Sequence, residues 1–143
     1  MKMYGLIGFP LTHSFSKQYY TDKFEKEGIT DTIFQNFPLI SIDEFPQLLK
    51  ANPALKGLSV TIPYKEQVLK YVNHLSEEVT EVGAANCIKT RGNELKAYNT
   101  DIIGFEKSFV KKLSPENSKA LILGSGGSSK AVQYVLKKLG IDF

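Results

Sequence analysis

The chain has 143 residues, of which 42% are hydrophobic and 23% are charged. This length suits one ordinary globular core, or one small domain with part of a second. The formal charge is only +3, and the basic residues are spread among acidic ones, so no basic stripe indicates nucleic-acid binding. No apolar run approaches the roughly 20 residues that span a bilayer, and one cysteine with two histidines offers no clustered metal site. We therefore expect a cytoplasmic protein with no metal, nucleic-acid or membrane partner.

Apolar runs alternate with helical patterns along the chain, which is typical of the α/β class. Strands are predicted at residues 3–8, 33–39, 55–62, 86–90 and 94–99. Helices are predicted from Ser16 to Gly28, from Ser41 to Pro53, over 64–72, from Ser76 to Gly83 and from Thr100 to Ser114. In the first helix Tyr19, Tyr20 and Phe24 have core spacing. Pro38 weakens the second strand, and residues 92–93 predict a hairpin turn.

The helix after residue 99 resembles a connector between two units. Asn99 or Thr100 is its predicted cap, and the Ser114-Pro115 pair its predicted end. Its predicted inward residues are Ile103, Phe105, Phe109 and Leu113. A short apolar strand at 120–123, a glycine-rich segment and a helix from 130 to 139 then follow, and the chain stops where another strand is due. A parallel sheet that stops there is incomplete, so we expect a truncated chain.

The glycine-rich segment fits most of the dinucleotide-binding fingerprint, because an apolar run precedes it and a helix follows. Its residues are Gly124, Gly126, Gly127, Ser128 and Ser129, with Ser129 where glycine or alanine is usual. Backbone N–H groups at the start of the helix can hold a pyrophosphate, and we favour phosphate binding over a purely structural turn. The residue that reads the ribose would lie roughly 20 positions further on, beyond the chain, so the choice between NAD and NADP stays open.

Polar side chains also follow the predicted strands, at the edge where open α/β sheets bind ligands. They are Ser14, Ser16, Thr61, Lys65, Asn86, Asn99 and Asp101. Hydroxyls and helix N–H groups suit a carboxylate, and Asn and Thr suit ring hydroxyls, so the set suits a small polyhydroxylated acid.

Each of these residues also has a purely structural interpretation. Ser16 could only cap its helix, Asp101 could only sit favourably in a first helical turn, and Lys65 could be a solvated lysine. Asn86 lies among apolar residues, where a structural hydrogen bond and a substrate contact are equally expected. Cys87 has no basic neighbour in sequence, which favours a packing role.

Taken together, five segments resemble the shikimate dehydrogenase family across nearly the whole chain. They are GFPLTHSFS (8–16), GLSVTIPYK (57–65), GAANC (83–87), YNTDIIG (98–104) and GSGGSSKA (124–131). The resemblance implies an open, mixed, mainly parallel sheet flanked by helices, followed by the first βα unit of a Rossmann domain. It further implies a substrate-binding and catalytic domain at 1–101, a connecting helix and linker at 102–118, and the start of the dinucleotide-binding domain at 119–143.

The resemblance also implies the chemistry and the residues that carry it. Ser14 and Ser16 would bind the shikimate carboxylate, and Thr61 would contact the substrate. Lys65 would be catalytic with Asp101 as its partner, and Asn86 and Asp101 would contact ring hydroxyls. Gly124, Gly126, Gly127, Ser128 and Ser129 would bind the cofactor. The implied reaction is the reversible reduction of 3-dehydroshikimate to shikimate by NADPH in aromatic amino acid biosynthesis, by a monomer or homodimer.

Some positions depart from the family pattern. Ser59 stands where the family usually has Asn, Cys87 where it has Thr, and Lys17 and Tyr19-Tyr20 where it commonly has Pro and His-Asn. These departures leave open a quinate/shikimate-type dehydrogenase of a related cyclic acid. A non-catalytic module that binds a small acid is a second alternative. The family's glutamine from a C-terminal helix is also missing, so we expect this chain to bind shikimate weakly and to turn over little or nothing.

Overall fold

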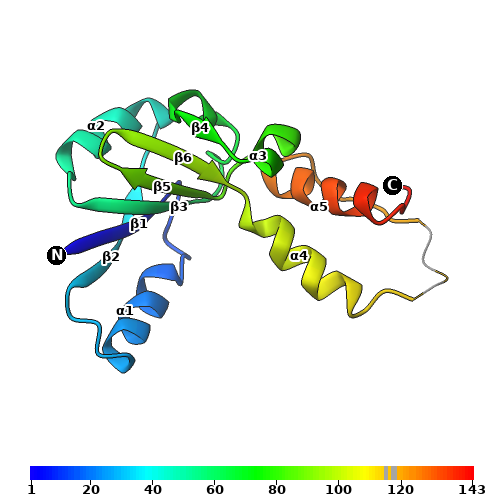
Figure 1. The fold of residues 1–143 in the computed structure, drawn as a ribbon, viewed down its shortest axis with the longest axis horizontal. Helices are drawn as coiled ribbons and strands as arrows, with labels where there is room; N and C mark the ends of the chain where they lie inside the picture. The colour runs from blue at the N-terminus through cyan, green and yellow to red at the C-terminus, as the bar shows by residue number, and fades with distance from the viewer. Residues whose placement is uncertain (115, 117–118) are drawn as a thin grey trace.

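A computed structural model of the chain describes residues 1–114, 116 and 119–143. Within these residues one six-stranded sheet forms in the order β2-β1-β3-β5-β6-β4 (Figure 1). The strands are β1 (Lys2–Gly8), β2 (Thr32–Pro38), β3 (Leu55–Val60), β4 (His74–Leu75), β5 (Cys87–Arg91) and β6 (Glu94–Tyr98). β5 is antiparallel to β3 and β6, whereas β1 with β2, β1 with β3 and β4 with β6 are parallel pairs. The predicted mixed, mainly parallel sheet is confirmed, and Pro38 ends an edge strand, where a missing N–H costs little.

The helices cover both faces of the sheet and one of its ends. They are α1 (Ser16–Lys26), α2 (Phe45–Ala51), α3 (Glu77–Val82), α4 (Thr100–Val110) and α5 (Gly127–Lys138), with 3-10 helices η1 (Ile42–Glu44) and η2 (Gln67–Tyr71). In Figure 1, α1 and α2 lie on opposite sides of the sheet, whereas α4 and α5 lie side by side beyond its end. Among the described residues no helix combines the length and the apolar character needed to cross a membrane.

Successive residues of β1 point into two different clusters, as the period of a strand requires. Leu6 packs with Phe34 and with the inner face of α1. Ile7 belongs to the larger cluster on the opposite face, which includes Phe45 of α2. The sheet therefore carries apolar side chains on both faces, with a helix over each.

A third cluster holds α5 against the end of the sheet domain. Val82, Ala84, Ile102, Ala131 and Val135 are buried together, from α3, the loop after it, α4 and α5. This packing places the start of α5 beside the loop that follows β3. The glycine-rich segment thus lies next to the predicted polar edge of the sheet.

The helix predicted over 64–72 is wrong, because only the short η2 forms there. Tyr64 is buried and its hydroxyl donates to the carbonyl of Leu39, which anchors the chain before η2 begins. Val72 is already extended, since the chain must reach the two-residue strand β4 at His74. β4 itself was not predicted, because two residues carry no periodic signal.

Two helical faces were predicted only in part: Tyr20, Phe24 and Phe105 pack against the buried clusters, whereas Tyr19 and Ile103 do not. No residue of α1 is buried, and Tyr19 is 61% exposed, although Tyr20 stacks on Phe34 at 4.5 Å between ring centroids. In α4 the buried residue is Ile102, whereas the predicted Ile103 is 52% exposed, because α4 packs through Ile102 against α5 and Ala84.

The strand predicted at 120–123 is not formed. Within the described chain only a single bridge pairs Lys119 with Asp142, and Leu121 and Leu123 are 85% and 89% exposed. A parallel strand needs a neighbour to satisfy its backbone groups, and in the part of the chain that the structure describes Asp142 is the single partner. α4 ends at Val110, and Pro115 of the predicted helix end lies outside the described residues.

Candidate functional site

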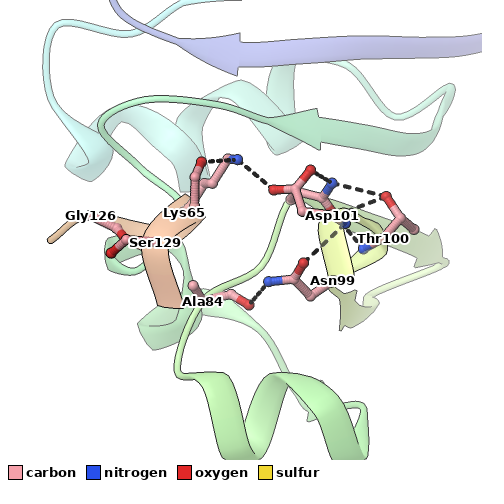
Figure 2. Close-up of polar contacts among 9 residues, drawn as sticks. Lys65, Ala84, Asn99, Thr100, Asp101, Gly126 and Ser129 are labelled. Carbon is pink, nitrogen blue, oxygen red and sulfur yellow. Dashed lines mark hydrogen bonds and ion pairs between the residues drawn. The ribbon is translucent and has the colours of Figure 1, made fainter. Parts of the chain in front are cut away.

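A lysine and an aspartate meet at the edge of the sheet where β3 and β6 end (Figure 2). Nζ of Lys65, in the loop after β3, donates to Oδ2 of Asp101, in the first turn of α4, at 2.6 Å. The side chain of Lys65 is only 13% exposed and that of Asp101 35% exposed. Lys65 is therefore not a solvated surface lysine. A charge-assisted hydrogen bond of this length fixes the ammonium group in direction as well as in place.

Asn86 holds the second oxygen of the same carboxylate. Its Nδ2 donates to Oδ1 of Asp101 at 2.8 Å, and its Oδ1 accepts from the backbone N–H of Thr100 at 2.8 Å. Asn86 thus makes the structural hydrogen bonds that one of its two interpretations requires. Its contact with a substrate stays a prediction.

Asn99 fixes the start of α4 and is the helix cap, rather than Thr100. It is 4% exposed, its Oδ1 accepts from the N–H of Asp101 at 3.1 Å, and its Nδ2 donates to the carbonyl of Ala84 at 2.9 Å. Figure 2 shows these two bonds beside the Lys65 pair. The buried amide therefore ties the loop before β5 to the residue that holds Lys65.

Ser14, Ser16 and Thr61 line one cleft of about 510 Å³ at the same edge of the sheet. The N–H of Phe9 donates to the carbonyl of Ile62 at 3.0 Å, which joins the two segments that supply these hydroxyls. The structural interpretation of Ser16 as a cap is wrong, because Phe15 is the N-cap of α1. Instead the hydroxyl of Ser14 accepts from the N–H of Ser16 at 3.4 Å.

The glycine-rich segment and the Lys65 loop enclose a second cleft of about 370 Å³. It is lined by Ile62, Pro63, Lys65, Glu66, Leu123, Gly124, Gly126, Gly127, Ser128 and Ser129. A Cβ atom at Gly124 or Gly126 would meet nothing within 4 Å, so the backbone there is open to a ligand. Gly126 caps the twelve-residue helix α5, whose first N–H groups suit an anion.

Two polar contacts across this cleft were not predicted. The hydroxyl of Ser128 accepts from Nζ of Lys65 at 2.9 Å, and Nζ of Lys130 lies 2.5 Å from Oε2 of Glu66. The partners are 63 and 64 residues apart in sequence. No local pattern could have indicated them, because they depend on how α5 packs.

The largest cleft, about 860 Å³, lies elsewhere, between α1 and the sheet. Its lining is mainly apolar and includes Tyr4, Tyr20, Phe24 and Ile29. None of the predicted site residues lines it, although Ser59 and Cys87 do. Burial raises the pKa of the Cys87 thiol, in keeping with packing. We assign the site to the two smaller clefts, because hydrogen-bonding groups converge there and not at the largest one.

Among the described residues no group of three His, Cys, Asp or Glu side chains could hold a metal ion.

The fold and the site define a class: an α/β domain with hydroxyls, an amide and an ion pair at one sheet edge, beside a glycine-rich helix start. Residues 6–88 match the family model described as the shikimate dehydrogenase substrate binding domain. The chain belongs to the shikimate dehydrogenase family.

Individual relatives agree with the family model. The chain is 37% identical to a shikimate dehydrogenase (NADP(+)) of Caldicellulosiruptor saccharolyticus over 99% of its own length and 52% of the relative's. It superposes on shikimate dehydrogenase 1 of Peptoclostridium difficile with a TM-score of 0.87 and 36% identity, covering 99% of this chain and 54% of that one. It also superposes on shikimate 5-dehydrogenase of Thermus thermophilus in complex with NADP(H) and shikimate, with a TM-score of 0.84 and 26% identity over 99% and 54%. The chain thus spans about half the length of its relatives.

Proposed function

We propose that this chain is the substrate-binding and catalytic part of an NADP-dependent shikimate dehydrogenase. In this proposal residues 1–101 bind the substrate, 102–118 connect, and 119–143 begin the dinucleotide-binding domain. The observation that carries it is the Lys65–Asp101 pair, held by Asn86 at the sheet edge and facing the glycine-rich segment. Names of the relatives, and the complex of the Thermus protein with NADP(H) and shikimate, support the choice of substrate and cofactor. A cytoplasmic location and a monomeric or homodimeric state stay predictions.

Ser14, Ser16 and Thr61 bind the acid in this proposal. Their hydroxyls share one cleft, and the hydroxyl of Ser14 retains its own proton to donate while accepting from Ser16. A carboxylate accepts hydrogen bonds from such hydroxyls. Asn86 and Asp101 then contact hydroxyls of the ring.

Lys65 moves the proton. Reducing a ketone requires a proton on its oxygen, and the reverse reaction requires a base for the same hydroxyl proton. The ammonium of Lys65 donates the proton in reduction and, as an amine, takes it back in oxidation. Asp101 holds the ammonium toward the substrate through a charge-assisted hydrogen bond of 2.6 Å.

The residues at the second cleft fit a dinucleotide. Gly124, Gly126 and Gly127 would hold its pyrophosphate through open backbone at the start of α5, with Ser128 and Ser129 beside it. Bound there, NADP(H) would supply the hydride. The hydroxyl of Ser129 already donates to the carbonyl of Gly126 at 2.8 Å, which shapes the turn.

A related cyclic acid such as quinate is the second candidate substrate. Ser59 and Cys87, two of the positions that depart from the family, line the largest cleft rather than the polar cleft that holds Ser14, Ser16 and Thr61. A non-catalytic acid-binding module would bind the acid without any dependence on a cofactor.

Calorimetric titration of shikimate into the chain tests the proposal. We expect weak, saturable binding. Ser14→Ala should reduce the affinity at least about tenfold, because the carboxylate of shikimate loses the hydrogen bond that the Ser14 hydroxyl donates. Ser108→Ala is the matched control, because that hydroxyl bonds only its own helix among the contacts described, at the carbonyls of Gly104 and Phe105. Tighter binding of quinate than of shikimate would favour the second candidate, and NADPH oxidation by this chain at the rates of whole dehydrogenases would contradict the expected inactivity.

A further inference from the structure

We propose that Ser128 is a positioning residue for Lys65: its hydroxyl joins the glycine-rich segment directly to the reacting amine. This inference rests on the proposed function, in which Lys65 transfers the proton. Nζ of Lys65 donates to Oγ of Ser128 at 2.9 Å and to Oδ2 of Asp101 at 2.6 Å. Two of the three donors of the ammonium are thereby directed, and the third is left for a substrate oxygen.

The position of Ser128 is set by packing on both sides of it. A Cβ atom at Gly127 would lie 2.8 Å from Cβ of Lys65 and 3.2 Å from Cβ of Ala84, so the backbone here touches the stem of the lysine. Two residues beyond Ser128, Lys130 pairs with Glu66, the neighbour of Lys65. The hydroxyl of Ser128 is therefore held over Lys65 from both directions along the chain.

Ser129 provides a comparison within the same segment. Its hydroxyl donates to the carbonyl of Gly126 and so serves the turn itself. Ser128 instead presents its hydroxyl across the cleft, between two parts of the chain that are 63 residues apart. A dinucleotide bound at this segment would contact Ser128, which is already hydrogen-bonded to Lys65. Binding of the dinucleotide could therefore change the position of the Lys65 amine through this one hydrogen bond.

The reactivity of Lys65 toward an N-hydroxysuccinimide acetate reagent measures this contact without any ligand. Acetylation of each lysine is followed by mass spectrometry in the full chain, with the exposed Lys17 of α1 as internal reference. Freeing the amine from one acceptor should raise its rate about threefold to tenfold in Ser128→Ala. Ser129→Ala should leave the rate unchanged, and Ser128→Thr, which keeps the hydroxyl, should restore it. Thermal midpoints should stay close to wild type, because Ser128 is exposed.

An unchanged Lys65 rate in Ser128→Ala would overturn the inference. So would an equal rise in Ser129→Ala, or a rise at every lysine with a lowered thermal midpoint, because each would show general loosening of the segment. The outcome is independent of the proposed function, which the shikimate titration tests. A chain that fails to bind shikimate can still show the Ser128 effect, and the reverse also holds.

Discussion

Asp101 is the residue at which the hydrogen bonds of the site meet. Its two carboxylate oxygens accept from Lys65 and Asn86, and its N–H donates to Asn99. In Asp101→Asn one carboxylate oxygen becomes an NH₂ group, which is a donor. It must then face another donor, either Nζ of Lys65 or Nδ2 of Asn86, so one of the two hydrogen bonds is lost. We expect a loss of about 1 kcal/mol in the free energy of unfolding, after allowing for the partial exposure of the pair.

Urea denaturation measures this loss. Asp22→Asn is the matched control, since the exposed Asp22 accepts from Gln18 through one oxygen, which an asparagine amide can still provide. Equal stability of Asp101→Asn and wild type would show that the carboxylate is not held as described.

Asp43 gives the chain a defined response to acid. The hydroxyl of Tyr71, followed by the ammonium of Lys70, lowers the pKa of the Asp43 carboxyl from 3.8 to about 2. A folded-state pKa below the unfolded value contributes stability above pH 3.8, and that stability is lost as the pH falls toward 2. The thermal midpoint of Asp43→Asn should therefore lie below wild type at pH 6, and the two should converge near pH 2. A constant difference across this range would contradict the assignment.

At the residue scale the sequence predicted the features that depend on neighbouring residues, such as helix caps. Asn99 as a possible cap and Ser76 as a helix start follow from the residues themselves. The partnership of Lys65 with Asp101 came only from the family resemblance, because 36 residues separate them. The Ser128 contact had no signal, since it depends on the placement of α5.

At the scale of elements, the junction between α5 and the Lys65 loop depends on one glycine. Gly127→Ala would place a methyl group 2.8 Å from Cβ of Lys65, so α5 must shift. We expect a destabilisation of about 1–3 kcal/mol, the usual cost of overpacking. Gly104→Ala, on the exposed side of α4, meets nothing within 4 Å and should instead stabilise by up to about 1 kcal/mol.

Urea denaturation of both glycine variants provides the comparison. The opposite signs are the result that matters, because helix propensity favours alanine at both positions. A neutral or stabilising Gly127→Ala would show that α5 does not pack against the lysine.

Elements with strong local signals were predicted well, and those set by distant partners were not. Gly83 ends α3 and Gly92 turns the β5–β6 hairpin, both with positive φ angles, at the predicted places. η2 replaced a predicted helix because only two residues separate it from β4, which must be extended to pair with β6. Residues 120–123 have the composition of a strand, yet among the described residues only the bridge of the preceding Lys119 to Asp142 forms, because pairing rather than propensity decides.

At the scale of the whole molecule, one sheet edge gathers the chemistry while a different face holds the largest cleft. The segments that follow β1, β3 and β6, including the first turns of α1 and α4, supply the hydroxyls, the lysine and the aspartate. α5 brings the glycine-rich segment to the same place. The α/β class makes this edge predictable, because open α/β sheets bind ligands beyond the carboxyl ends of their strands. The contact of α5 with it could not be predicted, since it depends on a cluster drawn from α3, α4 and α5.

Backbone NMR of the ¹⁵N-labelled chain during addition of shikimate tests the central claim most directly. The account predicts saturable shifts of the amide signals of Ser14, Ser16, Thr61 and Asn86, with smaller changes elsewhere. Shifts confined to Tyr4, Phe24 and Ile29 would place the acid in the largest cleft and contradict the account. So would the absence of any saturable shift in a chain whose spectrum shows that it is folded.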